Sequence, residues 1–539
     1  FIQLRGTLGH QAQIRLEGIP LIFMQGQSIN LSALPLALFD TVRITRGGSS
    51  VDYGSGAQGG VVHLTHDSKR MKMPSSSLRV GSFGYARLSG IVPLTEGQDH
   101  ISVGVQLEKS EGDFHFEDLN GRSRIRENND HISANLFSLG RWQIPKLGTL
   151  TLLLDNYTDD RGEPGPMEFP NQRARSKTNR LISGLSMMLT PQYNGRLMTN
   201  LMVFSQIRQM RFTDQTPSYA GDPTRFQMTD SSLSGAINTQ FQLSPEVILS
   251  GHIETQHSEI KTRDSLKARH ERTLSSVIAN FEWHASQTLR ITAGSRLQQS
   301  DTTPQVLPRL GSSFHISETL QLNANISKFF RLPSLDELYF KGVGISGNAD
   351  LEPEKGTSAD TGVLWQPTSG IINAASLHGF ITAFDSLIFF APIDAYRFQT
   401  ENHPGGLIMG TEFMLKASIA DLKLHLSHRY QVSETQHDKR LALPYRPRHL
   451  SRMHLIRRFG PVSLKVSLNQ ISTQNIDVYG RRTLKGYQEV DTRIDFNRNQ
   501  GWLMSLSATN IFDKRDHRDF PTLPRPGRTL LLLLSLTGI

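Results

Sequence analysis

The segment from Val462 to Asn469, VSLKVSLN, decides the fold class because its residues alternate strictly between apolar and polar. The same alternation recurs at 422–427 (LKLHLS), 101–108 (ISVGVQLE) and 502–509 (WLMSLSAT). Successive side chains of a β-strand point to opposite faces, so each segment predicts a strand with one apolar and one polar face. Helical patterns are scarce, and the best short candidate is Ser28–Asp40. We therefore expect an almost entirely β protein.

Such two-faced strands fit either a sandwich with a dry core or a barrel whose apolar face meets lipid and whose polar face lines the lumen. The polar faces carry Lys, Arg, Glu and His, which a closed core would not tolerate and which favour a wide, wet interior. Long polar segments (111–129, 159–177 and 390–405) are expected as loops at one end of the barrel. Short turns such as Lys146–Gly148 are expected at the other end.

Composition excludes several functional classes. The 539 residues contain no cysteine, which excludes disulfides, thiolate metal sites and cysteine nucleophiles. The net charge of +9 is spread along the chain, so no nucleic-acid partner is expected. The longest strongly apolar run is Leu530–Leu534, far shorter than the roughly 20 residues of a membrane helix. The chain starts at Phe1 without a signal peptide, which we expect to lie upstream.

The first 67 residues differ from the rest because they combine short strands with many glycines. Strands are expected at Thr41–Thr45 and Val61–Thr65, separated by glycine-rich turns. The sequence thus predicts a small first domain at 1–67, a linker at 68–77 and a large β-domain at 78–539.

No motif indicates an enzyme, a cofactor or a metal. Gly54–Gly59 matches G-x-G-x-x-G, but the following residues 61–65 resemble a strand and not the helix that a dinucleotide site needs. His63 and His66, like His425 and His428, are three apart, so in a strand they face opposite sides and cannot share a metal ion. No set of residues suggests acid–base or nucleophilic catalysis.

Three groups of residues carry a resemblance to a known family. The first, in residues 1–66, consists of Arg5, Gly6, Glu17, Gly18, Arg46, Gly47, Tyr53, Gly54, Gly59 and Gly60. The second, in FFRLPSLDELYFKGVGISGNADLEPE at 329–354, consists of Arg331, Pro333, Glu337, Tyr339, Asn348, Leu351, Pro353 and Glu354. The third, near the C-terminus, consists of Asn510, Phe512, Gly527 and Arg528. Together they resemble the plug and barrel of the TonB-dependent outer-membrane receptors, and segments 155–180 and 112–129 add a weaker likeness.

The sequence departs from the family pattern at three points. Gly48 replaces a proline that usually follows the Arg-Gly pair, and the chain ends in Leu536–Ile539 without the usual aromatic residue. Nothing resembles the TonB box or the first half of the plug, so the TonB contact cannot be assigned to a residue.

The resemblance implies an all-β membrane protein: a large antiparallel transmembrane β-barrel of about 22 strands with a small, partial α+β plug inside its lumen. Residues 78–539 provide about 21 residues for each strand with its connection, which suffices for spanning strands of about 9–11 residues. It also implies that Arg5 and Arg46 pair with lumen carboxylates where a polar plug surface meets a polar lumen. The alternative is that these arginines only cap turns of the plug.

The resemblance implies a monomeric importer in the outer membrane of a Gram-negative bacterium, driven by the inner-membrane TonB complex and the proton-motive force. Outer-membrane lipid and lipopolysaccharide are expected around the barrel. The expected ligand is a chelated metal or cobalamin, with a ferric siderophore ranked ahead of cobalamin and haem last, because no histidine lies between Arg331 and Leu351. The residues that contact ligand stay unassigned.

Two further questions stay open in the sequence. The cationic loop residues either attract an anionic ligand or face solvent and lipopolysaccharide; they are Arg122, Arg124, Arg126, Arg173 and Arg175. The rival function is a passive porin-like or adhesin barrel with a vestigial plug.

Overall fold

The computed structural model describes residues 4–21, 34, 36–39, 41–66, 73–95, 99–215, 224–263, 268–300, 304–342, 345–393, 398–435, 442–477, 479–497 and 501–537. Most of the Ser28–Asp40 segment expected as a helix lies outside these ranges. Its described part contains the 3-10 turn η3 (Leu36–Leu38). The C-terminal Gly538 and Ile539 also lie outside the described residues.

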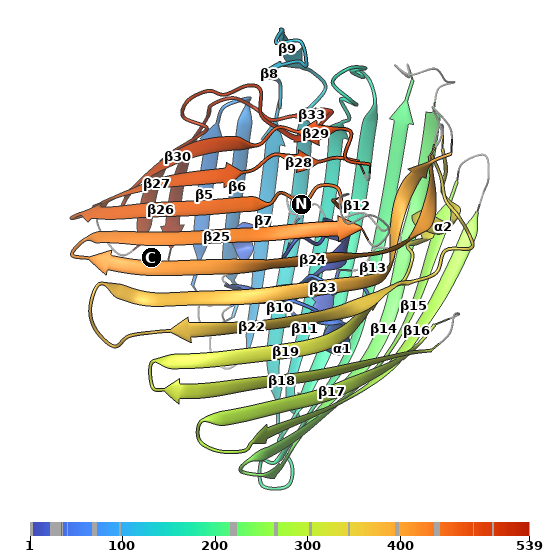
Figure 1. The fold of residues 1–539 in the computed structure, drawn as a ribbon, viewed down its shortest axis with the longest axis vertical. Coiled ribbons are helices and arrows are strands. Elements are labelled where there is room, and N and C mark those ends of the chain that lie inside the picture. The colour runs from blue at the N-terminus through green and yellow to red at the C-terminus, as the bar shows by residue number, and fades with distance from the viewer. Residues whose placement is uncertain are drawn as a thin grey trace.

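A closed antiparallel barrel of 22 strands dominates the structure (Figure 1). Strand β19 pairs directly with β22, and the last strand, β34, pairs with the first, β5, to close the ring. The strands are β5 (Ser75–Gly81), β6 (Tyr85–Pro93), β7 (His100–Ser110), β10 (His131–Ile144), β11 (Gly148–Gly162), β12 (Arg175–Leu189), β13 (Leu197–Asp214), β14 (Thr224–Ser244), β15 (Val247–Thr262), β16 (Arg269–His284), β17 (Leu289–Gln299), β18 (Gln305–Ser317), β19 (Leu320–Arg331), β22 (Glu354–Trp365), β23 (Ile372–Pro392), β24 (Phe398–Ile419), β25 (Leu422–Thr435), β26 (His449–Phe459), β27 (Val462–Ile471), β30 (Tyr487–Phe496), β31 (Trp502–Thr509) and β34 (Thr529–Thr537).

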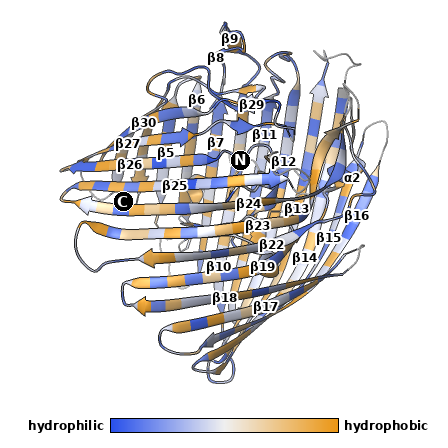
Figure 2. Cartoon of the chain, viewed as in Figure 1, coloured by the Kyte–Doolittle hydropathy of each residue, from blue (hydrophilic) through white to orange (hydrophobic). Residues whose placement is uncertain are grey.

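Hydrophobic and hydrophilic residues alternate along the barrel strands (Figure 2), and this alternation produces the two surfaces of the barrel wall. On β10, Leu136 is 52% exposed on the outer face, whereas the adjacent Asn135 is buried in the lumen. The amide of Asn135 donates to Asp155 on β11 (2.6 Å), and Arg180 on β12 donates to the same carboxylate (2.7 Å). The predicted wide barrel with a polar interior is confirmed, and the sandwich is excluded.

The two ends of the barrel differ, as expected from the sequence. Strands β10 and β11 are joined by a tight turn in which Lys146 has a φ of +65°. We call this the turn end. At the opposite, loop end lie long connections with their own short elements: β8 (Phe114–Glu117), β9 (Ser123–Arg126), α2 (Leu335–Tyr339), β20 (Lys341–Gly342), β21 (Ile345–Ser346), β28 (Gln474–Asn475), β29 (Thr483–Leu484), β32 (Arg518–Phe520) and β33 (Leu523–Pro524).

One expected loop is largely strand. The segment 390–405 was predicted as a loop from its polarity, but β23 continues to Pro392 and β24 begins at Phe398. Their ladder reaches this height through pairs such as Phe390 with Thr400. The prediction was wrong because a strand that projects beyond the membrane no longer needs an apolar outer face.

The plug is a four-stranded sheet with strand order β2-β1-β4-β3, and it lies inside the ring of barrel strands (Figure 1, blue). Its elements are η1 (Gly9–Gln11), β1 (Ala12–Leu16), β2 (Ile19–Pro20), β3 (Thr41–Arg46), α1 (Ser50–Tyr53) and β4 (Gly60–Thr65). Strand β4 follows the G-x-G-x-x-G segment, as predicted. Barrel strand β5 begins at Ser75, so it overlaps the end of the segment 68–77 expected as a linker.

Among the residues that the structure describes, no helix is long and apolar enough to cross a membrane.

Candidate functional site

One side of the plug is seated on apolar residues of the lumen wall. Ile14, Leu16, Ile19, Leu21, Leu34, Leu38, Val62 and Leu64 of the plug form one buried cluster with Ile91, Phe137, Leu139, Leu153, Ile182 and Phe204 of β6 and β10–β13. We call this the apolar seat. A polar plug surface against a polar lumen was expected, and on this side that expectation was wrong. Burial of large apolar side chains stabilises seating here without any charge.

Ion pairs hold another side of the plug, against β22 and β24. Arg5 is buried, and its Nε lies 3.2 Å from Oε2 of Glu412 while its Nη1 lies 3.4 Å from Oδ2 of Asp360. Arg46 lies 3.7 Å from the same Glu412, but its side chain is 54% exposed. The predicted pairing of both arginines with lumen carboxylates is therefore confirmed. Because exposed pairs contribute little, Arg5 carries most of the effect.

The backbone beside these ion pairs requires glycine at two positions. Gly6 has a φ of +76°, and a Cβ on it would lie 2.9 Å from Oε1 of Gln431. Gly47 has a φ of +88°, and a Cβ there would lie 3.1 Å from both Arg5 Nη1 and Asp360 Oδ2. These two glycines of the plug motif let the backbone approach the barrel wall closely.

A fully buried polar contact between plug and barrel centres on Glu354, at the start of β22. Its Oε2 accepts hydrogen bonds from Arg331 Nε (2.8 Å) and from the plug amides Gln11 (3.2 Å) and Gln58 (3.0 Å). Its Oε1 accepts from the backbone N–H of Ile388 (3.0 Å). We call Glu354, Arg331, Glu337, Gln11 and Gln58 the Glu354 cluster.

Arg331 completes this cluster by binding a second carboxylate at the loop end. Its two terminal nitrogens donate to Glu337 on α2 at 2.8 and 3.0 Å. Glu337 and Ser334 also form a capping box that fixes the start of α2. Burial would raise the pKa of Glu337, but the guanidinium of Arg331 outweighs it and holds this pKa below its ordinary value.

His10 of the plug lies close to the Glu354 cluster. Burial lowers its pKa to about 4; Arg331 and Arg446 also lower it, while Glu354 and Glu337 act in the opposite direction. The imidazole is therefore neutral at ordinary pH, and charging it would add a third cation beside two arginines.

Helix α1 makes a third polar contact with the wall. Asp52 pairs with Arg309 on β18, and Arg309 in turn donates to Asn280 (3.1 Å). The hydroxyl of Ser55, just after α1, accepts from the backbone N–H of Leu332 (3.0 Å). The plug is thus joined to strands far apart around the barrel.

Above the plug, a cavity of about 920 Å³ opens among the long connections of the loop end. Its lining includes Arg126, Asn129, Asp130, His131, Arg161, Glu163, Pro164, Gly165, Pro166, Tyr445, Asp477, Arg482, Phe520 and Pro521. The rings of Tyr445 and Phe520 lie 5.0 Å apart between centroids. We call this the loop-end cavity, and its size is typical of pockets for large small-molecule ligands.

The carboxylates around this cavity already have hydrogen-bond partners within the protein. Asp130 accepts from Arg175 (2.9 Å), and Glu163 accepts from the hydroxyl of Ser176 (2.6 Å). Asp477 accepts from the backbone N–H groups of residues 479, 481 and 482. Glu163 and Asp477 keep their negative charge, and the lining balances it with Arg126, Arg161 and Arg482.

Arg126 has donor capacity left over at this cavity. Its side chain is 5% exposed, one terminal nitrogen donates to the carbonyl of Gly165, and the other, Nη1, has no partner among the described residues. Burial lowers the pKa of Arg126, and the nearby Glu168 offsets part of this. An unpaired, nearly buried guanidinium is well suited to bind an anionic group.

The structure brings some predicted motif residues together and leaves others apart. Arg331, Glu337 and Glu354 meet in one cluster, and Arg5 and Arg46 share Glu412. Tyr339 instead stacks on His270 of β16, with ring centroids 3.8 Å apart. Pro333, Leu351 and Pro353 are buried, and the backbone N–H of Asn348 donates to the backbone carbonyl of Glu337 (2.8 Å).

The C-terminal motif lies away from the plug, in the connection between β31 and β34. The amide of Asn510 donates to the carbonyl of Lys514 (2.7 Å), and the N–H of Arg528 donates to Asp513 (2.8 Å). A side chain at Gly527 would collide with Asp513, whereas Phe512 is 67% exposed. This motif shapes the final hairpin.

Sequence reasoning missed the wall partners of the plug and part of the loop-end cavity. The wall partners lie on strands with the ordinary apolar–polar alternation, and no neighbouring motif distinguishes them; they are Glu412, Asp360 and Arg309. The cavity residues Tyr445 and Phe520 are far apart in the sequence, in two different connections. The sequence did single out the loop cations and segment 155–180, and among these residues Arg126, Pro164 and Pro166 line the cavity.

Comparison with known proteins agrees with this architecture. The family model described as "TonB dependent receptor-like, beta-barrel" matches residues 114–511, and that described as "TonB-dependent Receptor Plug Domain" matches residues 1–61. The chain belongs to the TonB-dependent receptor family. Members of this family are receptors and transporters and not enzymes. Relatives of the chain are outer-membrane receptors, so the barrel is one of the Gram-negative outer membrane.

Relatives of known name are distant. The chain is 21% identical over 414 residues to the vitamin B12 transporter BtuB of Photobacterium profundum, covering 73% of this chain and 62% of that protein. It is 20% identical over 543 residues to BtuB of Vibrio cholerae, covering 95% and 82%. An iron-regulated outer membrane virulence protein of Vibrio cholerae is 23% identical over 403 residues, covering 66% and 54%.

Solved structures share the fold. The copper transporter OprC superimposes with a TM-score of 0.84 at 16% identity, over 99% of this chain and 92% of that one. The ferric enterobactin receptor PfeA of Pseudomonas aeruginosa gives a TM-score of 0.80 at 16% identity, with the same coverage. Ligands named for these relatives differ, so the likeness establishes the receptor fold and not a substrate.

Proposed function

We propose that this chain is an active importer that captures a bulky chelated-metal nutrient in the loop-end cavity and admits it when the TonB complex, driven by the proton-motive force, displaces the plug. The observation that carries the proposal is a plug held by both apolar and ionic contacts beneath a cavity of about 920 Å³. A seat of this kind blocks free diffusion, so passage requires work on the plug.

Cobalamin and an anionic ferric siderophore are the two candidate ligands. The likeness to vitamin B12 transporters supports cobalamin, with matches to BtuB from two organisms. The unpaired Nη1 of Arg126 supports an anionic ligand, because a charge-assisted hydrogen bond would use its free donor. A ferric siderophore complex combines a chelated metal with negative charge. We assign the charged motif residues at the plug–wall contacts to seating of the plug and not to ligand contact; they are Arg5, Arg46, Arg331, Glu337 and Glu354.

Binding and uptake measurements separate these ligands. Cyanocobalamin and ferric enterobactin are titrated into the detergent-solubilised receptor, and uptake is followed in cells with and without a functional TonB. Import requires that deletion of TonB abolishes uptake while binding persists. Binding of neither probe, or uptake that persists without TonB, would overturn the respective part of the proposal.

A matched pair of variants tests the role of Arg126. Removing a hydrogen bond to a charged group costs about 1.5–3 kcal/mol, so Arg126→Gln should weaken binding of an anionic ligand about 10- to 100-fold. Arg173→Gln is the control, because Arg173 is an exposed loop arginine that does not line the cavity. Equal affinities of the two variants for ferric enterobactin would refute a direct contact.

The rival passive porin makes the opposite prediction in planar bilayers. The seated plug predicts almost no conductance for the intact receptor, whereas a porin conducts steadily. Steady conductance of the purified wild-type protein would therefore replace the importer with a porin.

A further inference from the structure

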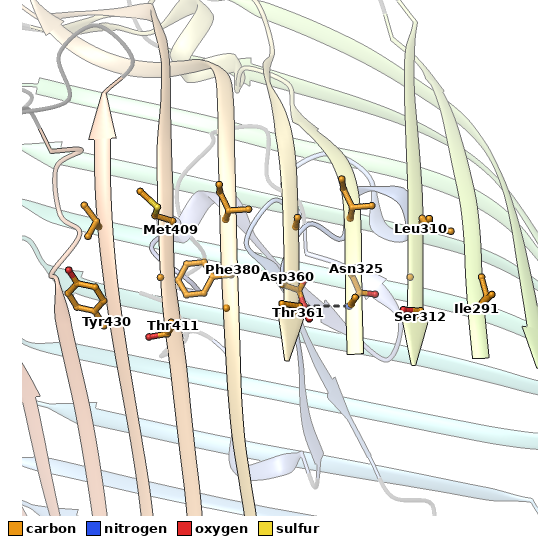
Figure 3. Close-up of a pocket in the computed structure, with 18 residues that line it drawn as sticks. Ile291, Leu310, Ser312, Asn325, Asp360, Thr361, Phe380, Met409, Thr411 and Tyr430 are labelled. Carbon is orange, nitrogen blue, oxygen red and sulfur yellow. Dashed lines mark hydrogen bonds between the residues drawn. The ribbon is translucent and has the colours of Figure 1, made fainter. Parts of the chain in front are cut away.

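A groove of about 950 Å³ crosses the outer wall of the barrel over strands β17–β19 and β22–β25 (Figure 3). Its exposed apolar side chains, such as Ile326 and Ile381, face away from the lumen, because they alternate with lumen-facing neighbours such as Phe380, which contacts Arg5 and also borders the groove. In an outer-membrane barrel this face lies against lipid. The groove shares no lining residue with the loop-end cavity.

The floor of the groove is a continuous row of small side chains fixed by strand register. Ser312 pairs with Ala324, Ala324 with Thr361, Thr361 with Gly379, and Gly379 with Thr411. Four strand-to-strand steps at the usual spacing make this floor about 19 Å long. A Cβ added at Gly379 would meet no heavy atom within 4 Å, so the space above the floor is open.

Large apolar side chains form a wall along each side of this floor. The wall nearer the loop end consists of Leu310, Ile326, Ile381, Met409 and Val432, and the opposite wall consists of Phe314, Leu322, Val363, Leu377 and Phe413. Leu310, Ile326, Leu377 and Ile381 are all more than 40% exposed. A floor of small residues between two apolar ridges complements a single hydrocarbon chain.

The two ends of the groove differ in polarity and in height. Ile291 closes one end near the turn end of β17. Tyr430 closes the other end, where it pairs with His449, the first residue of β26 at the loop end. The rings of Tyr430 and His449 lie 5.1 Å apart, and His428 lies 5.6 Å from His449 and 2.8 Å from the Ser451 hydroxyl. The groove thus crosses the apolar band diagonally, with its polar end toward the cell surface.

We propose that this groove binds one acyl chain of an outer-leaflet glycolipid, with the lipopolysaccharide head group beside Tyr430, His428 and His449. Amphipathic rings at the membrane interface suit a phosphorylated sugar head group, which offers hydrogen-bond acceptors above an apolar tail. An inner-leaflet phospholipid would place its head group at the opposite, apolar end, beside Ile291. Polarity therefore favours the outer-leaflet lipid.

The test fills the groove and measures bound lipid. The full-length receptor is extracted in mild detergent from cells, and lipopolysaccharide and phosphatidylethanolamine per barrel are counted by native mass spectrometry. Gly379→Leu places a side chain in the open space and should lower bound lipopolysaccharide about tenfold, which corresponds to 1.4 kcal/mol. Gly235→Leu is the matched control, because Gly235 also has open space around its Cβ and pairs with the outward-facing Val203 on β13, outside the groove.

The outcomes separate the possible occupants. Selective loss of lipopolysaccharide in Gly379→Leu, with the control unchanged, supports the proposal. Equal retention in both variants, loss of phosphatidylethanolamine instead, or a wild-type dimer that Gly379→Leu converts to monomers would each overturn it. If Gly379→Leu does not assemble, Ala324→Leu, which also lies on the floor, decides by the same readout.

Discussion

Replacing Glu354 with glutamine should loosen the plug far more than its small change in shape suggests. Glu354 is 1% exposed, and the groups facing it from Arg331, Gln11 and Gln58 are all donors. A glutamine amide turns its own NH2 either toward these three donors or toward the backbone N–H of Ile388, and it removes the charge that balances Arg331. Because Arg331 keeps Glu337, the loss should fall at the lower end of the range for a broken buried ion pair, about 3 kcal/mol.

This loss of free energy can be measured as easier release of the plug from the barrel. About 3 kcal/mol is roughly a hundredfold shift in the ratio of seated to released plug. At usual urea dependences it corresponds to about 1–3 M less urea for the onset of conductance in planar bilayers. The measurement titrates urea against conductance for the wild type and for Glu354→Gln, which should open first.

Glu489→Gln provides the matched control. Glu489 is also a buried carboxylate with an arginine partner, Arg525 at 3.1 Å, but it contacts no described plug residue. It should leave the onset of conductance where the wild type has it. If Glu354→Gln and Glu489→Gln both begin to conduct at the same urea concentration as the wild type, the Glu354 cluster does not hold the plug in place.

Three further predictions concern contacts of the plug, and each is measured as the urea concentration at which conductance begins. Arg5→Ala should lower the onset by the equivalent of about 3 kcal/mol, whereas Arg46→Ala should cost under about 1 kcal/mol because its side chain is exposed; equal effects would contradict this. Leu16→Ala should cost about 2–5 kcal/mol, with the exposed Leu36→Ala as control. Since the pKa of His10 is lowered to about 4, the unseated, unfolded plug takes up a proton that the seated plug does not as pH falls from about 6.5 to 4; stability should fall across that window, and His10→Gln should remove this pH dependence.

The alternation of apolar and polar residues predicted the barrel because it is a local property of each strand. It is present wherever one face of a strand meets lipid and the other meets the lumen. Register and long-range pairing are not local. Arg5 and Glu412 are 407 positions apart, and no pattern in either neighbourhood selects the partner. The family resemblance identified Arg5 and Arg46, but only the closed ring of strands determines which lumen carboxylates they reach.

The apolar seat had a signal in the sequence that the alternation argument passed over. Residues 152–154 are three consecutive leucines, and Leu181 is followed by Ile182, so these strands are apolar on both faces. Leu153 and Ile182 point inward and are buried against the plug, while Leu154 and Leu181 face outward and are exposed. In these two strands, loss of alternation coincides with packing against the plug, whereas the apolar run Leu530–Leu534 of β34 contributes no residue to the apolar seat.

The apolar seat and the ionic contacts of the plug differ in the displacement over which they resist a pulling force. Hydrogen bonds and ion pairs weaken steeply once donor and acceptor separate, and water then replaces them. Apolar contact is lost in proportion to the area exposed, so it resists over a longer displacement. Arg5 and Gln11, which precede β1, belong to the ionic contacts, whereas Ile14 and Leu16 within β1 belong to the apolar seat. Because β1 lies between β2 and β4 in the plug sheet, a pull that begins at Arg5 would first break polar contacts at the wall. It would then separate β1 from β2 and β4. The lumen would open in this step without any rearrangement of the barrel strands.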